Sequence, residues 1–367
     1  MKKKLLALAV AGALTAPLAA QAQNVQIYGV LQMSVDRVDN GDETGTGMKD
    51  NSSRIGFRGS EDLGGGLKAI FQLESAVQPD ERNGNWTGRD SWVGLSSNSL
   101  GTIRVGSMFT AYKSSTDYAD PFADTIGDYN NIVGSVGAGS AFRPFDARAN
   151  NAIAYTSPTF GGFTVTATYG MNSAADGFES KGSDTVRSIA AVYKAGGLTL
   201  TAAYEDKQEY RHADGFNRPT DNTKALKLSG GYKFGSTNVA LLWAREDFGD
   251  DAAIKTLGGH VVPAGDIRGS DRERDVIFAS IKHSIGNIDL MASYTWADDV
   301  DDIKKSGADA FALGAVYNFS KRTNIGAYYA QVDNDRNARQ GLASGGWNPA
   351  KNGEKVKAFS VRVRHAF

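Results

Sequence analysis

The sequence predicts an all-β protein, a 16-stranded antiparallel β-barrel that crosses a membrane. Three observations lead to this fold class. Polar and apolar residues alternate with period two along many segments of the 367-residue chain, the connections between these segments are short and long in turn, and the apolar faces end in aromatic residues. Period-two alternation indicates strands with two different faces, and the other two features are typical of a transmembrane barrel.

Composition excludes several other classes of protein. The chain has no cysteine, which rules out a disulfide framework and thiolate catalysis. No uninterrupted run of 18 apolar residues follows residue 22, so a helical membrane protein is excluded. With 43 glycines, 8 prolines and many Tyr and Phe residues, the composition fits both a soluble secreted β-protein and an outer-membrane barrel, and only periodicity separates the two.

The N-terminus reads as a secretory signal. Three lysines precede an apolar run over Leu5–Ala16, Pro17 breaks the run, and Ala20–Ala22 forms a small-x-small cleavage site. We therefore expect residues 1–22 to be cleaved and residues 23–367 to form a single barrel domain. Without those three of the 40 basic residues, 37 basic residues face 41 acidic ones, a formal charge of −4. This balance gives no basic footprint for nucleic acid.

The alternation is clearest over residues 163–169, where Phe163, Val165, Ala167 and Tyr169 face one way and three threonines face the other. Segments of this kind predict an even number of strands, about sixteen. The expected strands are residues 25–36, 53–60, 66–75, 89–96, 101–111, 148–157, 162–170, 187–195, 197–205, 224–234, 237–246, 274–283, 286–296, 308–318, 323–332 and 355–367.

The connections between these strands alternate in length. The long connections contain from about ten to nearly forty residues and are rich in Asp, Asn, Gly and Ser. A barrel with short periplasmic turns at one end and long external loops at the other has this pattern, whereas a soluble sandwich has no reason to separate its loops in this way. The short connections are residues 60–65, 97–100, 158–161, 195–196, 235–236, 284–285 and 319–322.

Aromatic and charged residues decide between a sandwich and a membrane barrel. Aromatic girdles belong at the two membrane interfaces, and aromatic residues end the apolar faces here at Tyr169, Tyr193, Tyr204, Tyr232, Phe234, Tyr294, Trp296, Tyr317, Phe319 and Phe367. Charged side chains in mid-strand would strongly destabilise the core of a sandwich but are common in a water-filled lumen. The opposite face carries such charges at Arg54, Arg58, Lys68, Glu74, Arg104, Lys227, Lys282 and Arg362.

One long segment, from Thr110 to Arg148, lacks the alternation. A loop of nearly forty residues is uncommon and is usually functional or disordered, but this one carries apolar residues such as Phe122, Ile126 and Ile132 that need a surface to pack on. We expect the loop, about residues 111–147, to fold back into the lumen and narrow it. Four of its acidic residues, Asp117, Asp120, Asp124 and Asp128, cluster around an Asp-Pro-Phe break.

Short motifs spread along the whole expected mature chain resemble those of Gram-negative general porins of the β-proteobacterial type. They are QIYGV at 26–30, SRIGFRG at 53–59, WVGL at 92–95, GTIRVG at 101–106, DPF at 120–122, NAIAYTSP at 151–158 and the terminal Phe367. The resemblance implies a homotrimer of 16-stranded barrels among the lipids and lipopolysaccharide of the outer membrane. It further implies a third external loop that forms an eyelet, and a terminal Phe367 that the barrel assembly machinery reads.

The resemblance also implies the residues of the eyelet, in which loop acids face a ladder of wall arginines. The loop candidates are Asp117, Asp120, Asp124 and Asp128, although Asp120 precedes a proline and can simply start a turn. The wall candidates are Arg54, Arg58, Arg89 and Arg148. Strand parity places each of these arginines on the face opposite an apolar residue, and therefore in the lumen. Arg54 and Arg58 alternate with Ile55 and Phe57. Arg148 is opposite in parity to Ile153 and Tyr155, and Arg89 to Trp92. Each arginine has a simpler reading as a solvated wall charge.

The expected function is passive diffusion of ions and small hydrophilic solutes through a water-filled channel. A selective channel for phosphate or another anion ranks lower, because a lysine-rich eyelet would favour it and the loop has only Lys113. A barrel enzyme ranks third, because the four histidines are isolated, so no catalytic residue, metal site or cofactor is expected. The acidic cluster at residues 298–302 reads as a solvated loop, with divalent-cation binding as its alternative.

Overall fold

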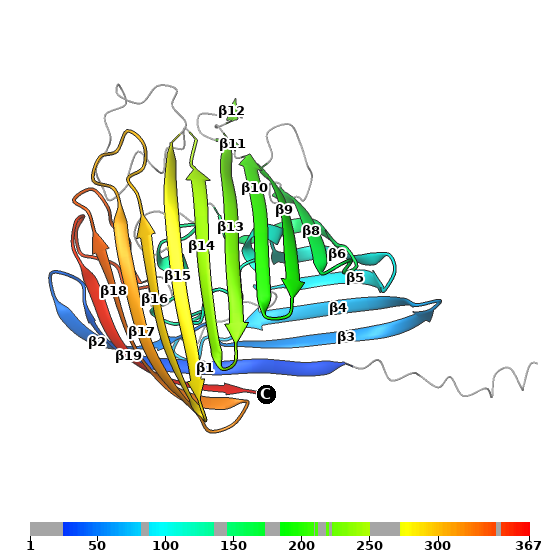
Figure 1. Cartoon of the computed structure of the whole chain (residues 1–367), viewed down its shortest axis with the longest axis horizontal. Helices are drawn as coiled ribbons and strands as arrows, with labels where there is room; N and C mark the ends of the chain where they lie inside the picture. The colour runs from blue at the N-terminus through cyan, green and yellow to red at the C-terminus, as the bar shows by residue number, and fades with distance from the viewer. Residues whose placement is uncertain are drawn as a thin grey trace, which may run out of the picture.

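The computed structural model describes residues 25–81, 88–135, 145–172, 184–208, 210–211, 218–219, 222–249, 272–342 and 346–367. The predicted signal segment, residues 1–22, lies outside the described residues. Antiparallel strands wind around a common lumen (Figure 1). The helices of the described ranges include none that is long and apolar enough to cross a membrane.

Neighbouring strands pair in sequence order, and the first pairs with the last, so the barrel is closed. A separate two-stranded ribbon, β11 (Tyr210–Arg211) and β12 (Arg218–Pro219), lies outside the barrel sheet. The barrel strands are β1 (Gln26–Asp39), β2 (Thr44–Asp50), β3 (Arg54–Gly64), β4 (Leu67–Ala76), β5 (Ser91–Ser97), β6 (Gly101–Phe109), β7 (Arg148–Thr156), β8 (Phe163–Asn172), β9 (Asp184–Ala195), β10 (Leu198–Gln208), β13 (Thr223–Phe234), β14 (Thr237–Asp247), β15 (Glu273–Ile285), β16 (Ile288–Ala297), β17 (Ala308–Asn318), β18 (Thr323–Asn334) and β19 (Val356–Ala366).

Two of these strands, β2 and β3, together occupy one strand position in the barrel. β2 pairs with the C-terminal half of β1, from Met33 to Asp39, and β3 pairs with its N-terminal half, from Gln26 to Val30. The break between β2 and β3 includes Ser52 at φ +62°, a left-handed conformation that interrupts a strand. Counting β2 and β3 together gives the sixteen strands that the sequence predicts, and the fold class is confirmed.

The strand β2 itself was not predicted, because its sequence TGTGMKD lacks an alternating apolar face. It forms because β1 continues to Asp39, three residues beyond its expected end. That extension offers backbone groups that need partners, and the chain folds back to pair with them. The remaining predicted strands agree with the structure to within a few residues.

The two faces of the wall differ as the alternation predicts. Large apolar side chains such as Ile27, Leu241 and Leu313 point outward and are more than half exposed without lipid. The opposite positions face the lumen and include the charged residues Arg54, Lys227 and Arg362. An apolar exterior over a polar interior is the reverse of a soluble barrel.

Barrel closure depends on a glycine near the start of the first strand. The backbone amides of Gly29 and Phe367 each donate to the carbonyl oxygen of the other residue, at 3.1 Å. A Cβ atom on Gly29 would lie 2.5 Å from the Phe367 ring and 2.6 Å from the carbonyl oxygen of Arg54. The terminal aromatic ring therefore packs over a position that only glycine can occupy without a shift of the backbone.

The candidate pore constriction

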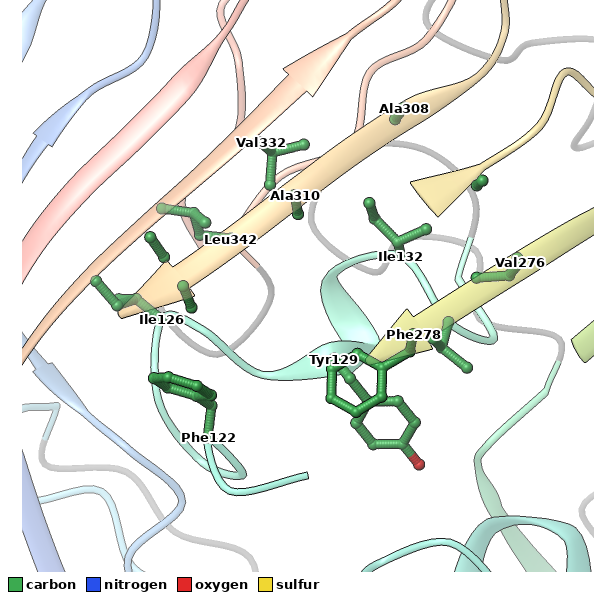
Figure 2. Packing of buried hydrophobic residues seen from close by; sticks show 14 of the residues in the cluster. Phe122, Ile126, Tyr129, Ile132, Val276, Phe278, Ala308, Ala310, Val332 and Leu342 are labelled. Atoms are coloured by element: carbon green, nitrogen blue, oxygen red, sulfur yellow. The ribbon is translucent and has the colours of Figure 1, made fainter. Parts of the chain in front are cut away.

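The loop between β6 and β7 enters the lumen, as predicted. It starts with the short helix α2 (Ala111–Ser114), whose N-cap Thr110 accepts a hydrogen bond from the Lys113 amide, and continues into the 3-10 turn η1 (Tyr129–Asn131). Its apolar side chains are buried against the inner face of the wall, and Figure 2 shows Ile126, Tyr129 and Ile132 packed against strand residues. Residues 136–144 of the loop, including Phe142, lie outside the described residues.

The wall beneath the loop contains many small residues. Lumen-facing alanines leave room for the aromatic and branched side chains of the loop, which are buried in the same hydrophobic cluster. The wall position of Gly314 shows how close this packing is, since a Cβ atom there would lie 3.0 Å from the Phe122 ring. The buried alanines of this region are Ala240, Ala244, Ala297, Ala308, Ala310, Ala312 and Ala330.

A buried ion pair fixes the end of the loop to the wall. The Lys227 ammonium of β13 lies 2.6 Å from a carboxylate oxygen of Asp146, and both side chains are 0% exposed. The ammonium also donates to the Thr116 hydroxyl at 3.2 Å and lies 3.9 Å from the centroid of the Tyr112 ring. A buried charge is stable only when it is paired and hydrogen-bonded in this way.

A second buried pair fixes the middle of the loop. Arg274 of β15 lies 2.7 Å from Glu246 of β14, and the guanidinium also donates to the carbonyl oxygens of Ile132 and Ser135, both at 2.8 Å. Glu246 in turn accepts a hydrogen bond from the Gly134 amide at 2.7 Å. The loop backbone is therefore bonded to both charges of a wall ion pair, which holds it against one side of the lumen.

Asp124 lies at the tip of the loop and touches the wall. Its backbone has φ +59°, a left-handed conformation that Asp tolerates better than most residues. One carboxylate oxygen accepts hydrogen bonds from Arg54 at 3.1 Å and from Gln32 at 3.2 Å. The Arg362 guanidinium donates to the Asp124 carbonyl oxygen at 3.3 Å and to the Tyr328 hydroxyl at 2.7 Å.

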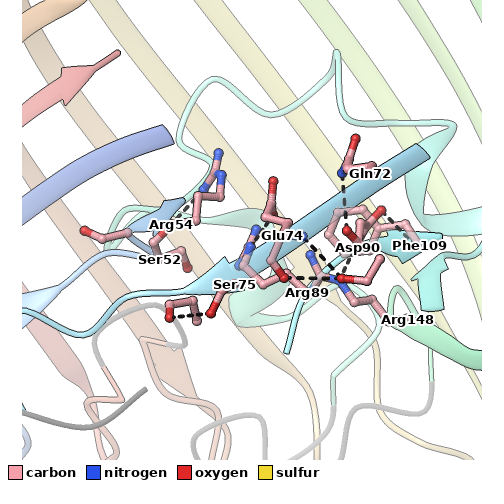
Figure 3. Close-up of polar contacts among 12 residues, drawn as sticks. Ser52, Arg54, Gln72, Glu74, Ser75, Arg89, Asp90, Phe109 and Arg148 are labelled. Atoms are coloured by element: carbon pink, nitrogen blue, oxygen red, sulfur yellow. Dashed lines mark hydrogen bonds and ion pairs between the residues drawn. The ribbon is translucent and has the colours of Figure 1, made fainter. Parts of the chain in front are cut away.

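The other predicted arginines have partners within the wall, and Figure 3 shows those of Arg89 and Arg148. Arg89 forms an ion pair with Glu74, and Arg148 lies 2.6 Å from Asp90. Arg58 donates to the side-chain oxygen of Gln26 at 2.8 Å. Among the described residues, Arg54 is the only one of the four that forms an ion pair with a loop aspartate.

Placing Arg89 in the lumen opposite Trp92 implied that Trp92 faces the lipid, and this was wrong. Trp92 packs with lumen-facing residues, while Val93 and Leu95 point outward. Arg89 nevertheless faces the lumen, because it precedes the start of β5 at Ser91 and strand parity does not apply to it. Its direction is set by Glu74, a lumen-facing residue of β4.

The four loop acids occupy two kinds of position. Asp117 is exposed to the lumen but crowded by protein, and this reduced hydration raises its pKa to about 6. Asp120 is instead only 7% exposed and accepts hydrogen bonds from the Phe122 and Tyr129 amides. Burial and the neighbouring Asp128 raise the pKa of Asp120. Asp128 caps η1 by accepting from the Asn130 amide at 2.8 Å, so these last two acids support the loop itself.

Sequence reasoning missed several residues at the opening. The sequence prediction left Arg362 as an ordinary wall charge and did not single out Arg364, yet Arg362 donates to the Asp124 carbonyl oxygen and Arg364 lies within electrostatic range of the same residue. Arg362 and Arg364 are two residues apart and alternate with Val361 and Val363. This alternation indicates that both arginines lie on the lumen face of the last strand. Glu74, Asp90 and Gln32 were missed as partners because their contacts join residues 15, 58 and 92 positions apart, which no local pattern links.

The described histidines take part in no cluster. His283 and His365 are hydrogen-bonded to Thr237 and Thr323 on neighbouring strands, whereas His212 and His260 lie outside the described residues. In the described part of the chain, no group of three or more His, Asp or Glu side chains is arranged to hold a metal ion. In the acidic loop, Asp299 accepts hydrogen bonds from three backbone amides, of residues 305–307.

Comparison with known proteins agrees with this geometry. A family model described as Gram-negative porin matches residues 7–337. The chain is 30% identical to the major outer membrane protein P.IB of Neisseria meningitidis, with all of both chains covered.

Solved structures share the architecture. The anion-selective porin from Comamonas acidovorans is 27% identical, with a TM-score of 0.77 over 94% of this chain and 100% of that one. The trimer form of OmpT from Vibrio cholerae has a TM-score of 0.68 at 16% identity, over 94% of this chain and 100% of that one. The chain belongs to the Gram-negative porin family and forms a diffusion channel in the outer membrane.

Proposed function

We propose that this diffusion channel has an eyelet formed by Asp117 and Asp124 of the loop and by Arg54, Arg362 and Arg364 of the wall, and that it weakly favours anions. Solutes would pass by size and hydrophilicity, and the charges would bias which ions enter. The proposed preference for anions gives the sign of ion selectivity, which the alternation and composition of the sequence leave open.

The observation that carries the proposal is the charge balance at the loop tip. Arg54 and Arg362 both bond to Asp124, one through its carboxylate and one through its carbonyl oxygen. Arg364 interacts electrostatically with both arginines and with the same aspartate. Three arginines thus surround Asp124, although only Arg54 forms an ion pair with its carboxylate. On the adjoining wall, the ion pairs of Arg89 and Arg148 are close to neutral.

Opposed charges across a narrow opening create a transverse field. Such a field orients small dipolar solutes and disfavours apolar ones, while the excess of one sign sets ion selectivity. The relative from Comamonas acidovorans is an anion-selective porin, which supports the same sign here. A phosphate-specific channel gains no support from Lys113, because its ammonium is buried and bonded to Asn130 at 2.6 Å, away from passing solutes.

The assembled state belongs to the same proposal. We expect a homotrimer in contact with outer-membrane lipids and lipopolysaccharide, as the trimer form of the Vibrio cholerae relative suggests. The exposed terminal ring of Phe367, which is 43% accessible at the barrel edge, is available for reading by the barrel assembly machinery. Current records that close in three equal steps would support the trimer.

The test is the reversal potential of the purified channel in a KCl gradient across a planar bilayer. A unit charge about 5 Å from an ion in water changes its energy by roughly 0.8 kcal/mol, a factor of about four in local concentration. The wild type should favour chloride, and Arg362→Gln with Arg364→Gln should move the reversal potential toward cations. Lys321→Gln with Arg322→Gln, which removes the same two charges at a periplasmic turn, is the control and should have little effect.

A second set tests the ladder that the family resemblance implies. Replacing Arg54, Arg89 and Arg148 together by Gln should leave Glu74 and Asp90 without their ion-pair partners, remove one of the three arginines around Asp124, and move selectivity toward cations. A reversal potential that stays at the wild-type value in both sets of variants would refute the eyelet proposal.

A further inference from the structure

The lumen wall carries a second concave site, between the eyelet and the periplasmic mouth. It is a cavity of about 390 Å³ on β1, β3, β4 and β5, and its lining includes Gln26, Arg58, Ser60, Ile70, Gln72 and Trp92. Arg58 lies four residues from Arg54 toward the periplasmic turn, which is roughly 13 Å along the strand at about 3.3 Å per residue. A solute that has crossed the eyelet would meet this cavity next.

Strand parity places the cavity on the water-filled side of the wall. Ile27, Leu73 and Val93 point outward, with exposed fractions of 59%, 47% and 61%. Their neighbours Gln26, Gln72 and Trp92 therefore point into the lumen. The site faces the permeation path and is separated from the lipid by the sheet.

Arg58 brings an available positive charge to the cavity. Its Nε donates to Gln26, and its guanidinium carbon lies 5.0 Å from the centroid of the Tyr28 ring. The Tyr28 hydroxyl donates to Glu74 at 2.9 Å, which fixes the ring that supports the guanidinium. Within the described ranges, no carboxylate forms an ion pair with Arg58, in contrast to Arg54. Its two terminal amino groups remain available to a ligand.

The other side of the cavity is apolar and aromatic. Ile70 and the Trp92 ring face the same space as Arg58. A second cation, Arg104 of β6, lies 5.4 Å from the centroid of the Trp92 ring. The site thus combines one flat aromatic surface with a guanidinium suited to two parallel hydrogen bonds to a carboxylate.

We infer that this cavity is a transit site for small carboxylates that carry an aromatic ring, such as benzoate. The carboxylate would bond to Arg58 and the ring would pack on Trp92 and Ile70, an arrangement favoured for aromatic pairs. The volume suits a small ligand. Binding must be weak for a solute to leave, with a dissociation constant on the order of 1 mM. The inference rests on the proposed function, because it requires an open lumen.

The test measures single-channel conductance in KCl while benzoate is added in the millimolar range. Wild-type conductance should fall saturably with benzoate, less with acetate at the same concentration, and not with benzylammonium. Arg58→Gln should raise the half-blocking concentration about tenfold, as expected for loss of a charge-assisted hydrogen bond. Arg58→Lys keeps the charge but loses the planar fork and should give an intermediate value.

Lys68→Gln is the matched control. It removes the same charge from the lumen face of β4, outside the cavity lining, and should leave the benzoate block unchanged. Trp92→Leu should remove the preference for benzoate over acetate. Equal block by benzoate and acetate in the wild type, or equal effects of Lys68→Gln and Arg58→Gln, would overturn the inference. The eyelet proposal fails in a different measurement, the KCl reversal potential of the Arg362 and Arg364 variants, so the two failures are distinguishable.

Discussion

The ion pair between Lys227 and Asp146 should decide how firmly the loop stays in the lumen. Lys227→Met fills much of the same volume but leaves the Asp146 carboxylate buried without a cation, at a site where both side chains are 0% exposed. Breaking a buried pair by removing one partner costs about 3–5 kcal/mol. At about 1.4 kcal/mol per factor of ten, the detached loop should become roughly a hundred to a few thousand times more populated.

Amide hydrogen exchange of the refolded protein measures this population. The Tyr112 amide donates to the Ser188 hydroxyl at 2.7 Å, and the Gly134 amide donates to Glu246 at 2.7 Å. Both bonds break when the loop leaves the wall, so both amides should exchange faster by about that factor in Lys227→Met. Amides in the barrel ladder should keep their wild-type protection, because local opening does not require the sheet to unfold.

The double variant Lys227→Met with Asp146→Asn is the control. It removes both charges, and Asn tolerates the left-handed backbone of Asp146, at φ +55°. Most of the lost protection should return. Should the double variant exchange as fast as Lys227→Met alone, or should the single variant leave the two loop amides protected, the ion pair would not be what holds the loop.

Three further predictions concern the opening and the closure of the barrel. Because the pKa of Asp117 is raised to about 6, this carboxylate is charged at pH 7.5 and largely protonated at pH 5; the reversal potential should therefore move toward anions on acidification, and Asp117→Asn should remove most of that change. Gly29→Ala places a Cβ atom 2.5 Å from the Phe367 ring and should lower the temperature at which the barrel unfolds in detergent, whereas Gly45→Ala, with nothing within 4 Å, should not; equal melting temperatures would contradict the packing at closure. Phe122→Ala empties a fully buried position at a cost of about 3–5 kcal/mol and should increase open-channel current noise, and a quiet channel would show that the ring does not hold the loop tip.

Part of the site followed from the sequence through a local rule. Strand parity alone placed Arg54 and Arg58 on the face opposite Ile55 and Phe57, and both do face the lumen. The same rule, applied to Trp92 without knowing where its strand begins, gave the wrong face. Parity is reliable within a strand and has no meaning across its end, which is why the direction of Arg89 depended on a contact with Glu74.

The sequence by itself determined the sixteen-stranded wall, the alternation of its faces and the presence of a long apolar loop that needed a surface. These features depend on the period-two geometry of the strand and on the cost of exposing apolar side chains to water. Only the tertiary structure decided which wall receives the loop and which charges meet at its tip. Asp124 lies 70 positions from Arg54 and 238 from Arg362, and no local pattern links residues so far apart. Closure of the barrel brings the first and last strands together, and that closure creates the arginine cluster around one aspartate.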